Sequence, residues 1–407
     1  MYRLLDSLMI VEASAFVAAP LAGLTLAQLG ADVIRVDMIG GGLDYKRWPL
    51  ADHSGASLYW AGLNKGKRSV AVNLRDPRGR ELVQALATRP GPAAGVLITN
   101  FADVPWLAQA ALEKHRADAI SVVVKGSPDG SPAVDYTINC AVGYPGLTGT
   151  GGENQPVNHV LPAWDVATGL HAALAVMASV DRRSRTGQGG RAEVALSDVA
   201  MAMVGNLGQI AEVQINNADR RPIGNDLYGA FGRDFATSDG RRVMIVALTV
   251  KQWHGLCRAC GIEDSVAALE TALVADFTDE GARFEWRQVL FALIERWCAT
   301  RTLAEIATAL DAEGLSWGPY QSVRQMLADD PRASTANPMF STVDHPDIGP
   351  VLTPGSPIAF LGTDRVPVAP APRLGADTDE VLAEVLGLTS GAIGRLHDDG
   401  IVASAEP

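Results

Sequence analysis

The stretch "SLMIVEASAFVAAPLAGLTLAQLGADVIRVD", residues 7–37, decides the fold class of this chain. Residues 7–13 form an apolar run that predicts a buried strand. Pro20 suits the first turn of a helix, which we expect to end at Gly30. Residues 32–37 predict the next strand. A strand, a helix and a strand in this order indicate a βαβ unit with parallel strands.

The same alternation continues over about the first 125 residues. This pattern predicts an α/β fold whose sheet is mostly parallel and Rossmann-like, with ligands bound beyond the carboxyl ends of the strands. The further strands are expected at 68–74, 95–101 and 119–126, with helices at 77–88 and 103–114.

The pattern changes in the middle of the chain, which predicts a second, smaller α/β domain. The stretch before it is polar and irregular, and the stretch after it is rich in proline before a final amphipathic helix in "TDEVLAEVLGL". The predicted segments are 1–204 (large domain), 205–225 (linker), 226–325 (small domain) and 326–407 (return linker and the rest of the large domain).

Composition predicts a soluble protein of the cytoplasm. The chain has 407 residues, 47% of them hydrophobic and 20% charged, and a net charge of −12. Such an acidic chain is not expected to bind nucleic acid or anionic membranes broadly. Four cysteines in this length form no disulfide framework, which favours a reducing compartment. No apolar run has the length and purity of a membrane span.

Several familiar motifs are missing from the sequence. The first strand leads into "ASAFVAAP" rather than G-x-G-x-x-G, so NAD or FAD is not expected. No P-loop, G-x-S-x-G elbow or H-E-x-x-H motif occurs, and no metal site is predicted. The "CRAC" of residues 257–260 lies in an amphipathic helix pattern that ends at Gly261, and no second CxxC pairs with it.

Basic residues follow several predicted strands, in "YKRWP" (45–49), "NKGKRS" (64–69) and "LRDPRGR" (74–80). Runs of charge are usually solvated faces. Lys46 and Arg47, however, lie in a glycine-rich loop beside aromatic residues. There a guanidinium could bind a carboxylate in a partly dry pocket.

One acidic residue, Asp165, is unusual in its surroundings. It lies in "LPAWDVATGLHAAL", residues 161–174, among apolar residues just before a helix pattern that reaches about Ser184. An N-cap role is the ordinary explanation. From these residues alone a structural and a functional role both stay open.

Four segments together resemble one family over nearly the whole chain. The chain is similar to the class III coenzyme A transferases (CaiB/BaiF-like), which also include α-methylacyl-CoA racemases. Within the family, "IGGGLDYKRWPL" (39–50) most resembles members that move CoA between the C1 and C4 carboxylates of mesaconyl-CoA. The four segments are "APLAGLTLAQLGADVIRVD", "SLYWAGLNKGKRSVAVNLRDPRGREL", "LPAWDVATGLHAALAVMASVDRRSRTGQGGRAEVALSDVAM" and "LGADTDEVLAEVLGLTSGAIGRLHDDGIV".

The resemblance implies a large Rossmann-like domain built from both ends of the chain, with the smaller domain between them. It also implies an interlocked, ring-like homodimer and a covalent mechanism. The catalytic aspartate of the family falls on Asp165. Its carboxylate would form an anhydride with the acyl group and then an aspartyl-CoA thioester. A helix N-terminus is expected to favour the ionised carboxylate. CoA belongs to the acyl-CoA substrate, so no separate cofactor is expected. Lys46 and Arg47 are our candidates for holding the dicarboxylate.

The resemblance also transfers a set of CoA contacts to this chain. The sequence departs from the family at Met38, where an arginine is common, and in "NFADVP", so Arg35 and Arg75 are expected to take a larger part in binding the phosphates. The transferred contacts are Val17 and Ala18 through backbone groups, Val72 and Arg75 near the phosphates, Asn100 and Phe101 in the "NF" pair, and Tyr136 near the thioester.

Three alternative functions differ in the residues that they require. A racemase of this fold uses a histidine with the aspartate, but no histidine occurs between His115 and His159. An intermolecular transferase that moves CoA between two different acids would share Asp165 and stays open. A non-catalytic acyl-CoA binding protein would not need Asp165 in a matching motif.

Overall fold

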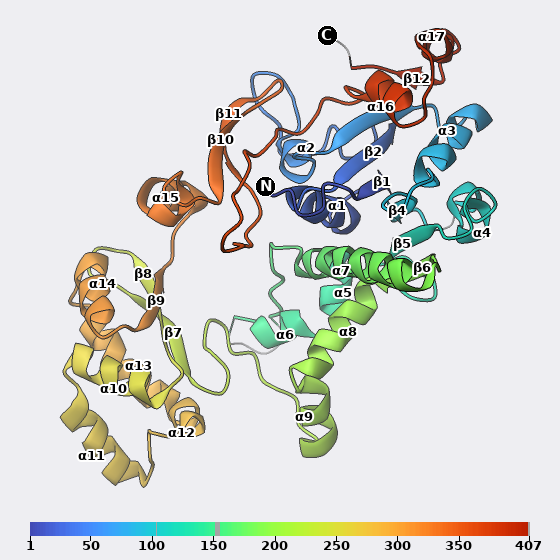
Figure 1. Cartoon of the computed structure of the whole chain (residues 1–407). Helices are drawn as coiled ribbons and strands as arrows, with labels where there is room; N and C mark the ends of the chain where they lie inside the picture. Colours follow the sequence, from blue (N-terminus) through green and yellow to red (C-terminus); the bar gives the residue numbers. More distant parts are fainter. Residues whose placement is uncertain (103, 151–154, 406–407) are drawn as a thin grey trace. The chain divides into compact units, whose positions relative to one another are not determined.

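The computed structural model describes residues 1–102, 104–150 and 155–405. The chain divides into two compact units, which we describe separately. The larger unit contains residues 1–142, 160–217 and 331–407, and the smaller unit contains residues 143–159 and 218–330. The larger unit thus includes both chain termini, as Figure 1 shows.

A seven-stranded sheet forms the centre of the larger unit (Figure 1). Its strand order is β12-β3-β2-β1-β4-β5-β6, and all neighbours pair in parallel except the edge strand β12. Apart from β12, this is the order of the doubly wound Rossmann fold, so the predicted Rossmann-like sheet is confirmed. The strands are β1 (Met9–Ala13), β2 (Asp32–Met38), β3 (Arg68–Val72), β4 (Val96–Thr99), β5 (Ile120–Lys125), β6 (Gly190–Ala195) and β12 (Val402–Ala403).

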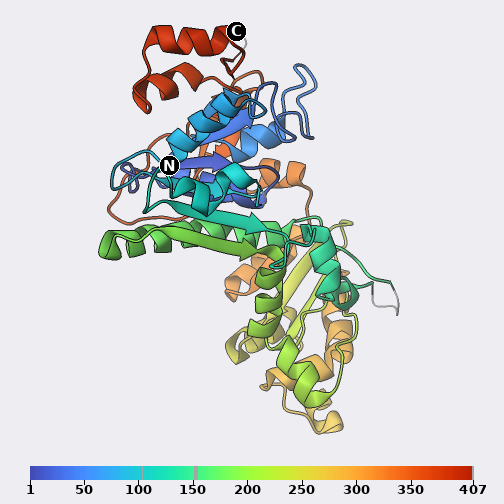
Figure 2. The ribbon, with the colours of Figure 1, turned by 90° about the vertical axis from the view of Figure 1, so that its right-hand side faces the viewer.

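Helices cover both faces of this sheet. The side chain of Val11 in β1 joins a core with α3, α16 and α17, whereas the next residue, Glu12, points to the opposite face, towards α1. The long helix α7 packs on α1 and runs along β5 and β6 (Figure 2). The helices of this unit are α1 (Ala18–Gln28), α2 (Leu58–Leu63), α3 (Pro77–Ala87), α4 (Gln109–Leu112), α5 (Asp135–Ala141), α7 (Ala163–Thr186), α8 (Leu196–Asn206), α9 (Gln209–Asn216), α16 (Thr378–Glu384) and α17 (Ser390–Asp398), with a hairpin of β10 (Phe340–His345) and β11 (Gly349–Pro354).

Three of the predicted segments differ from the structure. The helix expected at 103–114, whose first residue lies outside the described residues, is a 3₁₀ turn (Pro105–Leu107) followed by the short α4. Ala108 between them is extended, with φ −61° and ψ 146°, and this conformation interrupts the helix. The segment expected as an irregular linker, 205–225, contains α9. The helix in "TDEVLAEVLGL" is followed by another, α17.

The smaller unit has its own antiparallel sheet and its own apolar core. Strands β7, β8 and β9 pair in that order, and the core gathers around Phe231, Trp253 and Phe291. The "CRAC" segment lies in α10, which ends at Gly261, and burial raises the pKa of Cys257 to about 12. The elements are α6 (Tyr144–Thr148), β7 (Phe231–Ala236), β8 (Arg242–Ala247), α10 (Val250–Cys260), α11 (Glu263–Leu273), α12 (Glu280–Glu285), α13 (Arg287–Cys298), α14 (Leu303–Ala312), β9 (Ser316–Pro319) and α15 (Val323–Asp329).

Helix α7 alone among the described helices is long and apolar enough to cross a membrane by length and composition. It packs on α1 and on two strands, and its last turn carries Arg183 and Arg185. Within the structure, 33% of this apolar stretch is buried, and Leu170 and Leu174 are exposed.

Candidate active site

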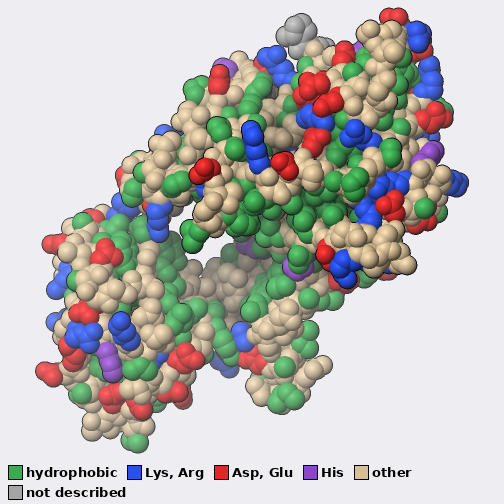
Figure 3. Space-filling model, viewed as in Figure 1, with side chains coloured by type: hydrophobic (Ala, Val, Ile, Leu, Met, Phe, Trp, Pro, Cys, Tyr) green, Lys and Arg blue, Asp and Glu red, His purple; other side chains and the backbone are tan. Residues whose placement is uncertain are grey.

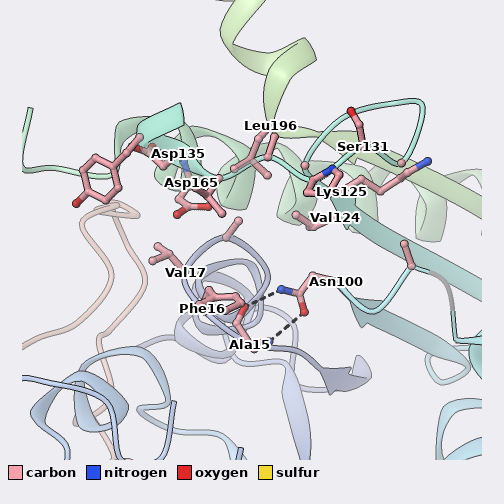
Figure 4. Close-up of a pocket in the computed structure, with 18 of the residues that line it drawn as sticks. Ala15, Phe16, Val17, Asn100, Val124, Lys125, Ser131, Asp135, Asp165 and Leu196 are labelled. Carbon is pink, nitrogen blue, oxygen red and sulfur yellow. Dashed lines mark hydrogen bonds between the residues drawn. The ribbon is translucent and has the colours of Figure 1, made fainter. Parts of the chain in front are cut away.

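A cavity of about 490 Å³ opens at the carboxyl ends of β1, β4 and β5. Strand β1 pairs with both β2 and β4, so the order of the strands reverses here, and ligands of this fold bind at such a point. Asn100, just after β4, connects the loop after β4 to the loop after β1. The Ala15 N–H donates to Asn100 Oδ1 (3.0 Å), and Asn100 Nδ2 donates to the Ala15 carbonyl (2.8 Å), as drawn in Figure 4.

The loop between β1 and α1 is held in an unusual backbone conformation. Phe16 has a φ of 69°, in the left-handed region that disfavours a residue with a Cβ. Its N–H donates to Asp44 Oδ1 (3.0 Å), which comes from the loop after β2. Val17 and Ala18 follow and line the cavity. Two separate side chains, Asn100 and Asp44, thus fix the loop that forms one wall of the cavity.

Asp165 lines the same cavity from the first turn of α7 (Figure 4). The helix begins at Ala163, so Asp165 is its third residue and the predicted N-cap role is wrong. The N–H groups of Trp164 and Asp165 both donate to Asp135 Oδ2, at 2.7 and 3.1 Å. Asp135, the first residue of α5, therefore caps α7 from another element and leaves the Asp165 carboxylate facing the cavity.

The surroundings of Asp165 disfavour its charge. Burial and the neighbouring Asp135 raise the pKa of Asp165 to about 6, while Arg47 acts in the opposite direction. We expected the helix N-terminus to favour the ionised form. That expectation does not hold, because burial and the charge of Asp135 raise the pKa of Asp165, and the N–H groups of Trp164 and Asp165 already donate to Asp135.

Arg47 brings a positive charge to the cavity from the loop before α2. Its guanidinium lies over the rings of Phe16 and Tyr59, with the guanidinium carbon 5.3 and 5.1 Å from the ring centres. In the described part of the chain, this guanidinium makes no ion pair. Lys46 is exposed and is not part of the cavity lining.

Tyr59 is a site residue that the sequence did not suggest. Its hydroxyl is buried and has no hydrogen-bond partner among the described residues. Burial and nearby Asp44 raise its pKa to about 12, so the phenol keeps its proton, and Asp165 adds to this effect. An unused donor thus lies close to Arg47, Asp44 and Asp165.

The residues transferred as CoA contacts fall into three groups. Asn100, Val17, Ala18 and Tyr136 line the cavity of Asp165. Phe101 lines a second, mostly apolar cavity of about 570 Å³ beyond β1 and β2.

The third group lies in neither cavity. Val72 is fully buried within β3, in the core between two strands, so its side chain cannot reach a ligand. Arg75 is exposed and follows Leu74, which lines the second cavity.

Arg35, which the sequence suggested as a ligand of the CoA phosphates, is already fully paired inside the large unit. Its side chain is 1% exposed and forms ion pairs with Glu12, Asp37 and Asp44. The guanidinium also donates to Asn64 Oδ1 and to the Ser14 carbonyl. These bonds use its donors inside the unit, so Arg35 stabilises the loops around the cavity instead of binding a ligand.

Comparison with known proteins identifies the class. The family model of CoA-transferase family III matches residues 5–378, and the chain belongs to this family. It is therefore an enzyme of the CoA-transferase class, and the predicted resemblance is confirmed. Over 406 residues, 100% of this chain and 99% of the relative, it is 53% identical to 2-methylfumaryl-CoA isomerase of Chloroflexus aurantiacus.

More distant relatives have the same extent. The chain is 28% identical to formyl-CoA:oxalate CoA-transferase of Rhodopseudomonas palustris, over 99% of this chain and 98% of that protein. The crystal structure of a CaiB/BaiF family protein from Brucella suis matches with a TM-score of 0.76 and 27% identity, covering 95% of this chain and all of the other. The fold is thus that of the CaiB/BaiF proteins.

Proposed function

We propose that this enzyme moves CoA within one molecule, between the C1 and C4 carboxylates of mesaconyl-CoA (2-methylfumaryl-CoA). The observation that carries the proposal is that the Asp165 carboxylate shares a cavity with Arg47, whose guanidinium makes no ion pair among the described residues. The 53% identity to 2-methylfumaryl-CoA isomerase supports the choice of substrate.

The proposed chemistry uses Asp165 twice as a covalent carrier. An Asp165 oxygen attacks the thioester carbonyl at C1, the C–S bond breaks and the CoA thiolate leaves, which gives a mixed anhydride. The thiolate then attacks Cγ of Asp165, the bond from Cγ to the bridging oxygen breaks and the C1 carboxylate leaves with that oxygen. An aspartyl-CoA thioester and free mesaconate remain.

The second half repeats these steps at the other end of the diacid. The C4 carboxylate attacks Cγ and expels the thiolate, and the thiolate attacks C4 and releases the Asp165 carboxylate. The mesaconate must stay bound between the halves, because retention makes its second carboxylate an intramolecular reactant with a high effective concentration.

Arg47 is the group best placed to retain the diacid. A guanidinium can bind a carboxylate through two parallel N–H bonds, and the rings of Phe16 and Tyr59 stack on this one. Lys46 stays a candidate for the approach of the anion, since it is exposed on the same loop.

Isotope labelling tests whether transfer is intramolecular. We would incubate the enzyme with mesaconyl-C1-CoA and ¹³C-labelled free mesaconate and analyse the products by chromatography and mass spectrometry. Unlabelled C4 isomer is expected. Labelled product, or no C4 isomer until another acid is added, would favour transfer between two different acids. The relative named formyl-CoA:oxalate CoA-transferase is, by its name, a transferase of that kind.

Oxygen isotopes test the covalent route. With ¹⁸O in the C4 carboxylate, the steps above return one substrate oxygen to Asp165 in each complete turnover. The peptide that contains Asp165 should gain 2 Da after one turnover and approach a gain of 4 Da after many, because either carboxylate oxygen can attack. A peptide of unchanged mass after many turnovers would rule out the anhydride, whatever the acid labelling shows.

We also propose a homodimer, as the family resemblance implies, that works in the cytoplasm on a soluble acyl-CoA without a separate cofactor. Exposed apolar side chains along α8 and α9, visible in Figure 3, support a second copy as the partner. They include Met201, Leu207, Ile210, Val213 and Ile215. Light scattering after size-exclusion chromatography should give twice the chain mass, and a monomer that is fully active would contradict the dimer.

A further inference from the structure

Two residues of α5, one turn apart, hold the start of α7. Asp135 Oδ2 accepts the N–H groups of Trp164 and Asp165, and Asn139 Oδ1 accepts the Trp164 indole N–H at 3.1 Å. Asp135 is 1% exposed and Asn139 is 2% exposed. This contact fixes the backbone of Asp165, and in Figure 4 the Asp135 and Asp165 side chains lie together at one wall of the cavity.

We propose that Asp135 is a positioning residue whose carboxylate fixes the first turn of α7 and, by repelling charge on Asp165, raises the population of the aspartyl-CoA thioester in which the diacid reorients. The inference rests on the function proposed above. It adds a reason why the cap of α7 is an acid, when a neutral acceptor could also receive both N–H groups.

The reason lies in where the charge is during the first half of the reaction. Before it, Asp165 is a carboxylate beside Asp135. After it, Asp165 is an uncharged thioester and the charge is on the released substrate carboxylate, which Arg47 can bind. Atoms and charge balance, because one thioester and one carboxylate exchange places. A neighbour that disfavours charge on Asp165 therefore shifts this internal equilibrium towards the enzyme thioester.

Two further charged groups near this site are already paired: Lys125, which lines the cavity, pairs with Glu193, and Asp44 pairs with Arg35. Asp165 is faced by Asp135 from α5, by Arg47 from the loop before α2 and by Tyr59 from α2. Arg47 stays positive and Tyr59 stays protonated at the pH of the assay. Removing the charge of Asp135 thus leaves Arg47 as the one ion beside Asp165 among these groups, and the pKa of Asp165 should fall.

The test is Asp135→Asn, which keeps an oxygen acceptor for both N–H groups and removes the charge. The acid limb of kcat/KM against pH, near pH 6 in the unchanged enzyme, should move down by about half a unit to one unit. The fraction of enzyme trapped as a CoA thioester, measured by mass spectrometry after acid quench, should fall roughly three- to tenfold. Asp181→Asn, at the exposed far end of α7, is the matched control and should change neither quantity.

Two outcomes would overturn the proposal, and a third would separate it from the intramolecular function proposed above. An unchanged acid limb and thioester fraction in a folded Asp135→Asn enzyme would reduce Asp135 to a cap. If that variant does not fold, the pH profile of the unchanged enzyme is the test. An acid limb of kcat/KM near pH 4 would mean that the pKa of Asp165 is not raised, and this would overturn the proposal. Incorporation of labelled acid would end the intramolecular mechanism and leave this inference standing, since both transfer modes pass through the thioester.

Discussion

At the scale of single residues, the mechanism proposed above requires the partly buried Asp165 carboxylate to be ionised when it attacks. A raised pKa of about 6 means that folding disfavours its charge, relative to a pKa near 4 in the unfolded chain. The folded state therefore loses stability as the pH rises from about 4 to 6, and the loss is complete above pH 6. Ionised Asp165 therefore destabilises the folded state at neutral pH.

Asp165→Asn should accordingly be inactive and more stable than the unchanged protein at pH 8. We expect a gain of about 1 to 3 kcal/mol in the free energy of unfolding. The gain should shrink as the pH falls towards 4, where the native carboxyl is protonated. Urea unfolding at several pH values measures it, and a gain independent of pH would assign the effect to packing.

Arg47→Ala should lower kcat/KM by roughly 10- to 100-fold, the usual cost of a lost charge-assisted hydrogen bond. Arg47→Lys should recover part of this loss, because it keeps the charge without the planar fork. Arg185→Ala, which removes the same charge from an exposed pair with Asp181, is the control. Isomerisation unchanged in Arg47→Ala would exclude Arg47 as the grip on the diacid.

What the sequence could reveal of the site follows from how local each signal is. Asp165 and Arg47 stand out from their immediate neighbours, by polarity in one case and by loop composition in the other. Asp135 lies 30 residues before Asp165, and its role arises only when α5 packs on α7. Tyr59 looks like an ordinary aromatic residue in a short helix. Its unpaired hydroxyl depends on the surrounding tertiary structure.

At the scale of secondary-structure elements, the close contact of α1 and α7 sets the position of the nucleophile. Gly169 of α7 has no side chain, and a Cβ there would lie 2.7 Å from the Ala18 carbonyl and 3.1 Å from the Leu21 Cβ. Ala18 lines the cavity opposite the first turn of α7. The two walls are thus held together by a packing contact one helical turn from Asp165.

Gly169→Ala should therefore destabilise the protein by about 1 to 3 kcal/mol and lower its activity, because the two helices must move apart. Gly394→Ala in α17 is the matched control. Its Cβ would meet nothing within 4 Å, so it should gain up to about 1 kcal/mol from helix propensity. Thermal unfolding and initial rates check both variants, and equal effects would argue against the contact.

The sequence predicted β1, β3, β4 and β5 well because each is a mostly buried, apolar run that can be recognised by itself. It failed where tertiary contacts decide. Residues 103–114 contain a helical pattern, but Pro105 and the extended Ala108 divide it. The edge strand β12 has two residues, and its pairing with β3 gives no local sequence pattern.

At the scale of the whole molecule, the two units have separate apolar cores. Units with their own cores usually unfold as separate cooperative blocks. Leu256→Ala in the smaller core and Leu97→Ala in the larger should each cost about 2 to 4 kcal/mol, since both side chains are fully buried. Calorimetry should show each variant shifting a different transition, and a single transition shifted by both would contradict this independence.

The end of the chain closes the edge of the large sheet. Val402 and Ala403 pair with β3, which lies more than 300 residues earlier in the sequence. Thr378 connects the two strands, since its hydroxyl accepts from the Ala71 N–H and donates to the Ala403 carbonyl. During synthesis the chain emerges from its amino end, and domains generally fold as units while it does so. The ribosome thus releases all of residues 218–330 before β12, the outer neighbour of β3, has been synthesised. A nascent chain stalled near residue 390 would have the whole small unit outside the ribosome, attached to a large unit whose outermost strand is bare.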